Sequence, residues 1–102
     1  MAVWLSPTSG LEFNVAVVTT SVTVATTPTL LYTSVGSSQV QLLNTSATVD
    51  VFIGNSLVST SNGFKIAASG SLTNVNLDHN ESLYGVVSTG TGTVAVFAVR
   101  KG

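Results

Sequence analysis

The sequence predicts an all-β protein, an antiparallel β-sandwich of the jelly-roll kind with about eight short strands. Three observations favour this class. The 102 residues include 15 Thr and 17 Val, and both residue types are β-branched and prefer strands. Glu, Lys and Arg, which favour helices, fill only five positions. Turn signals recur roughly every 8–12 residues between short apolar runs, as in sandwiches.

Residues 1–13 differ from the rest of the chain because they show no periodicity. They contain Pro7, Gly10 and large apolar residues, which are Trp4, Leu5, Leu11 and Phe13. We expect an extended N-terminal arm over 1–13 and a single β-sandwich domain over 14–102. The arm either docks Trp4 on a neighbouring subunit or folds as a terminal strand onto its own core. We expect no signal peptide, because the first residues lack a basic region and a long apolar run.

Strand signals begin at Asn14. Valines mark the runs 14–20 and 21–25, and Pro28 then interrupts the pattern, because proline cannot donate a ladder hydrogen bond. The run 29–33 restarts it.

The most regular alternation lies in the middle of the chain. Apolar and polar residues alternate through 39–43, where Val40 and Leu42 share a face, and again through 48–53. The polar residues 44–46 read as the turn between these runs. We therefore predict that 39–43 and 48–53 pair as a β-hairpin.

The second half of the chain continues the same pattern. Asn62-Gly63 is a strong turn signal because both residues tolerate positive φ, and 78–81 and 90–92 read as hairpin turns. The strands expected here are 57–58, 64–66, 72–77, 82–88 and 93–99. No amphipathic helical window separates the strands, which disfavours a parallel α/β architecture.

The last predicted strand is apolar on both faces. Val94, Val96 and Ala98 share one face, whereas Ala95, Phe97 and Val99 share the other. A sandwich strand normally has one core face and one solvated face. A second apolar face indicates contact with another subunit; the alternative is a central strand covered by a loop or by the arm.

Composition excludes several classes of function. Charged residues make up 7% of the chain, against about 25% in a typical soluble protein, and the net charge is −1. Nucleic-acid binding is not expected, because phosphate neutralisation needs clustered cations. No apolar run is long enough to span a membrane, and no cysteine is present. With a mean hydropathy of +0.52, such a chain is expected to be covered by partners.

The only titratable cluster is the polar segment 78–81. Asn76, Asp78 and Asn80 are spaced as in a calcium loop, but the downstream glycine and closing glutamate are missing. His79 is the only histidine and lies beside Asp78, whereas a catalytic triad needs a separate buried acid. We therefore expect no enzyme activity, no metal site and no cofactor.

Two further possibilities are weaker. Asp50 lies on a predicted strand, but surface solvation explains it better than a glycosidase site, which needs two carboxylates in one cleft. Phe52 and Tyr84 occupy positions that alternation turns outward, where aromatic rings can stack on sugars. Core packing is the ordinary alternative for both.

Several segments together suggest a family. They are 30–33, 40–44, 49–54, 61–64, 69–72, 83–87 and 92–96. From Thr29 onward their order resembles the small β-sandwich modules in virion proteins of tailed bacteriophages, found in head decoration and head-fibre proteins and in some tail or neck components. The resemblance implies a sandwich fold present in many copies on a symmetric shell, and no catalytic residues.

The expected function is therefore that of a structural virion protein, most simply a capsid decoration (cement) protein on the capsid surface. The resemblance implies the major capsid protein as partner and a homotrimer as assembly. The residues expected at the interface are Trp4, Leu5, Leu11, Phe13, Phe97 and Val99. The alternatives are a glycan- or receptor-binding module of a head fibre or tail, and a low-copy neck or tail component.

Overall fold

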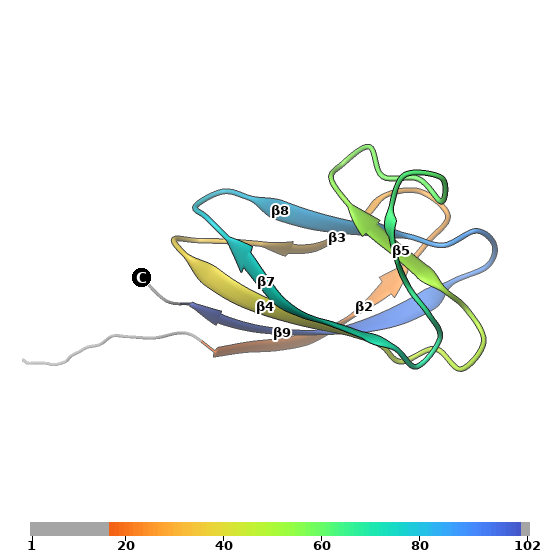
Figure 1. Ribbon diagram of the computed structural model, residues 1–102, viewed down its shortest axis with the longest axis horizontal. Coiled ribbons are helices and arrows are strands. Elements are labelled where there is room, and N and C mark those ends of the chain that lie inside the picture. Colours follow the sequence, from red (N-terminus) through yellow and green to blue (C-terminus); the bar gives the residue numbers. More distant parts are fainter. Residues whose placement is uncertain (1–16, 101–102) are drawn as a thin grey trace, which may run out of the picture.

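The computed structural model describes residues 17–100, which form two four-stranded antiparallel sheets that lie face to face (Figure 1). The eight strands are β2 (Val17–Val24), β3 (Thr29–Thr33), β4 (Ser38–Asn44), β5 (Val51–Gly54), β6 (Phe64–Ile66), β7 (Ser71–Leu77), β8 (Ser82–Val86) and β9 (Gly92–Arg100). The predicted all-β sandwich is confirmed. The predicted arm, residues 1–13, lies outside the described residues.

The strand order is that of a jelly roll. One sheet has the order β2-β9-β4-β7 and the other β3-β8-β5-β6. Consecutive strands therefore alternate between the two sheets, and within residues 17–100 only β5 and β6 are neighbours both in sequence and in a sheet. This is the eight-stranded double Greek key that capsid and lectin domains share.

The core fills the space between the sheets. In β9 the residues Val94, Val96 and Ala98 are fully buried, as the alternation predicts. Val40 and Leu42 of β4 lie beside them in the same sheet. The opposite sheet contributes Leu31, Val51, Ile53 and Ile66 to this cluster. Because successive side chains of a strand point to opposite faces, the residues between these positions face outward.

The predicted hairpin between 39–43 and 48–53 is wrong. The run 39–43 belongs to β4, which pairs with β7 and β9, whereas β5 pairs with β6 and β8 in the other sheet. The predicted turn 44–46 is therefore the end of β4 at Asn44 and the start of a connection between the sheets at Thr45. Alternation shows which face of a strand is buried, and both strands do bury the predicted face, but it carries no information about the partner strand.

Other expectations need smaller corrections. The predicted hairpin turns at 78–81 and 90–92 are wrong, because the segments 78–81 and 87–91 connect the two sheets. The runs that meet between Thr20 and Ser21 form one continuous strand, β2, because no turn residue separates them. Residues 57–58 lie in the loop between β5 and β6, where Val58 is buried without belonging to a strand.

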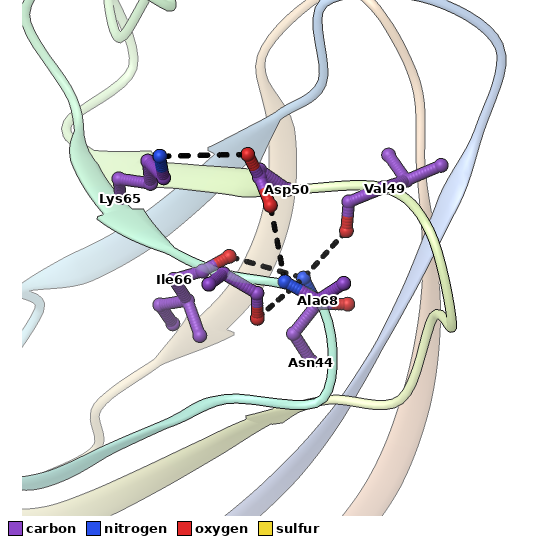
Figure 2. A network of polar contacts seen from close by, with 7 residues as sticks. Asn44, Val49, Asp50, Lys65, Ile66 and Ala68 are labelled. Carbon is purple, nitrogen blue, oxygen red and sulfur yellow. Dashed lines mark hydrogen bonds and ion pairs between the residues drawn. The ribbon is translucent and has the colours of Figure 1, made fainter.

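A buried asparagine holds the end of β4 against the opposite sheet (Figure 2). The Nδ2 group of Asn44, which is fully buried, donates to the carbonyl oxygens of Val49 at 2.7 Å, Ile66 at 3.1 Å and Ala67 at 3.2 Å. Its Oδ1 accepts a hydrogen bond from the backbone N–H of Ser46 at 3.0 Å. One side chain thus satisfies backbone groups of the β4–β5 connection, of the last residue of β6 and of the β6–β7 connection.

Asp50 extends this network towards the surface. Its Oδ1 accepts a hydrogen bond from the backbone N–H of Ala68 at 3.0 Å, and its Oδ2 lies 3.6 Å from Nζ of Lys65 (Figure 2). The role of Asp50 in the fold is therefore structural: its carboxylate replaces a backbone acceptor where the chain leaves β6.

Candidate interaction surface

The candidate binding surface is the outer face of the β2-β9-β4-β7 sheet, and we call it the β9 face. Its positions follow from the register, since paired residues of an antiparallel ladder point to the same side. They are Val17, Thr19, Ser21 and Thr23 of β2, Thr93, Ala95, Phe97 and Val99 of β9, Gln39, Gln41 and Leu43 of β4, and Ser71 and Asn76 of β7. None of these residues is charged.

Apolar side chains of the β9 face remain open to solvent. The exposed fraction is 41% for Phe97, 44% for Leu43 and 60% for Val17. Phe97 pairs with Thr19 on one side and with Gln41 on the other. The surface therefore consists of apolar groups surrounded by hydroxyls and amides, which suits a partner that is equally poor in charge.

A shallow groove of about 390 Å³ crosses this face. It is lined by Thr19, Thr20, Gln41, Leu42, Leu43, Ser71, Thr73, Ala95, Val96 and Phe97. One of its lining residues is the small Ala95, which pairs with Ser21 of β2 and with Leu43 of β4.

The structure places two of the six predicted interface residues on this face. Phe97 is exposed, and Val99 is half-buried between Val17 and Gln39. The other four, Trp4, Leu5, Leu11 and Phe13, lie outside the described residues.

Sequence reasoning missed Leu43 and Val17. Each lies next to an apolar residue of the inner face, Leu42 and Val18. The available signal was the apolar pair in each strand, 17–18 and 42–43, at a position where strict alternation would place a polar residue.

The aromatic residues considered for sugar binding lie on the other sheet. Phe52 and Tyr84 both point outward, as predicted, and both are half-buried. The loop 55–63 covers Phe52, since a Cβ at Gly63 would lie 2.7 Å from Cβ of Phe52. Tyr84 pairs with Gly54 on one side and with the exposed Leu30 on the other.

The polar segment 78–81 closes one end of the sandwich. Oε1 of Glu81 accepts the backbone N–H of Asp78 at 2.8 Å, and Nδ1 of His79 accepts the N–H of Gly36 at 3.1 Å. The N–H of Asn80 also donates to the carbonyl of Ser34 at 2.9 Å. The first contact lies within the β7–β8 connection and the other two join it to the β3–β4 connection, which gives the segment a structural role.

Among residues 17–100, no three His, Cys, Asp or Glu side chains lie close enough together to hold a metal ion. The same residues contain no helix that could cross a bilayer. Neither the protein-family models nor the curated proteins compared with the chain give a match.

Proposed function

We propose that the chain is a structural virion protein that decorates a capsid by binding the major capsid protein. The supporting observation is the β9 face, a complete sheet surface without charge that exposes Phe97, Leu43 and Val17. A lone soluble domain normally covers such a face with charged residues, so a charge-free face favours coverage by a partner.

The proposed mechanism is mechanical. Burying apolar surface stabilises an interface by about 25 cal/mol per Å² removed from water. Each copy contributes a modest amount, and the symmetry of a shell repeats that contribution at every equivalent position. The jelly-roll fold is compatible with this role, although the same fold carries unrelated functions. In this proposal the protein has no catalytic residues, binds no nucleic acid or membrane, and resides on the virion surface.

The arm residues Trp4, Leu5, Leu11 and Phe13 belong to the same proposal as a second contact with the shell. The homotrimer remains a prediction that rests on the resemblance alone.

The deciding experiment is quantitative mass spectrometry of purified virions from the source of the chain. A ratio to the major capsid protein of about one to one, or about one to three, is expected for a decoration protein. A handful of copies per virion would contradict decoration and indicate a neck, tail or fibre component. Complete absence of the chain would overturn the virion assignment.

A glycan-binding module is the second candidate, and Tyr84 is the residue that favours it. Its ring lies on an outer face beside Gly54, which has no side chain to cover it, and aromatic rings are common platforms for sugars. This candidate predicts binding on a glycan array that Tyr84→Ala removes while the unfolding midpoint stays close to that of the wild type. Unchanged binding by the variant would exclude Tyr84 as the platform.

A further inference from the structure

The four sheet edges within residues 17–100 differ in how well they are protected. Edge strands normally carry charge, proline, bulges or short lengths that prevent pairing with another chain. The ladder between β7 and its partner β4 shifts register between Val40 and Leu42. In β7 itself, Asn74 has a positive φ of 61°, which interrupts the regular strand. β3 has a register shift between Leu30 and Tyr32, and β6 has three residues, one of which is Lys65.

β2 has none of these protections. It pairs with β9 without a register shift over all eight residues, Val17–Val24, and contains no charged residue, proline or glycine. Within the described residues β9 is its only neighbour. As far as residues 17–100 are concerned, its other edge therefore presents a regular row of unpaired backbone donors and acceptors.

The core is also incomplete along β2. Val18, Thr20, Val22 and Val24 point inward, because they pair with the inward residues of β9. Val24 is fully buried, whereas Val18 and Val22 are half-buried and Thr20 is exposed. The inner layer thus ends with apolar side chains, Val18 and Val22, that pack against the core but are only partly covered, and a further strand beside β2 would complete their cover.

The sequence of β2 matches itself in reverse. Around Thr20, the segment 18–22 reads Val-Thr-Thr-Ser-Val, so valines lie two positions away on each side and hydroxyl residues one position away. In an antiparallel pair centred on Thr20, Val18 of each copy would oppose Val22 of the other, and Thr19 would oppose Ser21. β-Branched pairs and Thr–Ser pairs are favourable cross-strand neighbours.

We propose that two copies of the chain pair antiparallel along β2, with a two-fold axis at Thr20. The pair forms one continuous eight-stranded sheet, in which the two β9 faces become a single charge-free surface. This inference does not depend on the decoration role, since it stands on the edge, the open core and the self-complementary sequence. A two-fold contact cannot close a ring of three, so it differs from the trimer that the resemblance implies.

The absence of cysteine from the chain allows a direct test by cross-linking. In the proposed pair, position 20 of one copy lies directly opposite position 20 of the other. The Cα–Cα distance between opposed residues of antiparallel strands suits a disulfide, so Thr20→Cys should cross-link the two copies. The matched control is Thr23→Cys, also exposed on β2. In the proposed pair, position 23 of one copy would lie opposite position 17 of the other. The two introduced cysteines would therefore be six residues apart along the strands, or about 20 Å at 3.3 Å per residue.

Under mild oxidation we expect covalent dimers from Thr20→Cys and none above background from Thr23→Cys. No dimer from Thr20→Cys, or equal amounts from both variants, would overturn the pairing.

Solution mass provides the second measurement. We expect the unmodified chain to have twice the 10.4 kDa mass of one copy by native mass spectrometry. Thr20→Lys, which places two like charges at the axis, should halve that mass. Thr33→Lys, an exposed threonine on the edge strand β3, should leave it unchanged. A monomeric or trimeric wild type, or a Thr20→Lys variant that stays dimeric, would contradict the proposal, whatever the virion copy number proves to be.

Discussion

The side-chain amide of Asn44 donates a 2.7 Å hydrogen bond to the carbonyl oxygen of Val49, across the connection that carries the chain from one sheet to the other. This contact joins the last residue of β4 to a segment just before β5, and the same amide also bonds Ile66 and Ala67. A buried donor shared among three carbonyls is hard to replace, because all three acceptors would lose this partner and the bond to Ile66 is fully buried.

We therefore expect Asn44→Ala to lower the free energy of unfolding by about 2–3 kcal/mol. The control is Asn62→Ala, which removes an exposed 2.8 Å bond from the N–H of Ser59 to Oδ1 and should cost about 0.5–1 kcal/mol. Urea denaturation of both variants measures the difference. Equal losses would show that burial does not strengthen the Asn44 network.

The Asp50 carboxylate should contribute through its hydrogen bond more than through its ion pair. Lys65→Ala removes only a solvent-exposed pair and should change stability by less than about 1 kcal/mol. Asp50→Ala also removes the acceptor for Ala68 and should cost about 1–2 kcal/mol. Asp50→Asn keeps an acceptor and should recover most of that loss in the same denaturation assay. A Lys65→Ala loss as large as that of Asp50→Ala would contradict this order.

Gly63 is predicted to be sterically required. A Cβ there would lie 2.7 Å from Cβ of Phe52 and 3.0 Å from the carbonyl oxygen of Ser59. Gly63→Ala should therefore destabilise the protein by about 2 kcal/mol, as overpacking does. Gly90 has a φ of +66° and no atom within 4 Å of a built Cβ, so Gly90→Ala should cost only backbone strain, about 1 kcal/mol. Thermal unfolding of the two variants tests this order of stability losses. A larger loss for Gly90→Ala than for Gly63→Ala would contradict it.

Capsid binding should depend on Phe97. Phe97→Ser removes a side chain that is 41% exposed on the β9 face, so the stability loss should be about 1 kcal/mol while bound copies per capsid fall. Leu30→Ser is the matched control, because Leu30 is 48% exposed on an edge strand of the other sheet. The measurement is occupancy on capsids that lack the chain, after mixing with each variant. Equal occupancy for both variants would remove Phe97 from the interface.

Deletion of residues 1–13 should abolish capsid binding and leave the sandwich folded. The core of the sandwich within residues 17–100 draws its buried residues from Val24 to Ala98, so the deletion removes none of them. Circular dichroism checks the fold, and co-sedimentation with capsids checks binding. Full decoration by the shortened chain would show that the arm is not needed.

Much of the fold could be predicted from the sequence because burial leaves a period-two pattern. Alternation alone assigns Val94, Val96 and Ala98 of β9 to one face, and all three are buried. The pairing of strands could not be predicted in the same way. In a jelly roll almost every neighbour in a sheet is distant in sequence, so β4 pairs with β7 and β9 although β5 is nearer along the chain.

The candidate surface could be predicted only in part. Phe97 and Val99 were recognisable because their strand is apolar on both faces. The groove depends on Ala95 lying between Ser21 and Leu43, three residues that the register alone brings together. The edge of β2 that has no neighbour within residues 17–100 could not be predicted either, because a sequence does not state which strand lies at the edge of a sheet.

The position of β9 has a consequence for how the protein is made. This strand is the last described segment along the chain, yet it lies inside its sheet, between β2 and β4. Until residues 92–100 have left the ribosome, β2 lacks the one neighbour that it has within residues 17–100. The sheet therefore closes late and through long-range pairings, which makes folding slow and leaves the nascent β2 exposed to other chains during synthesis.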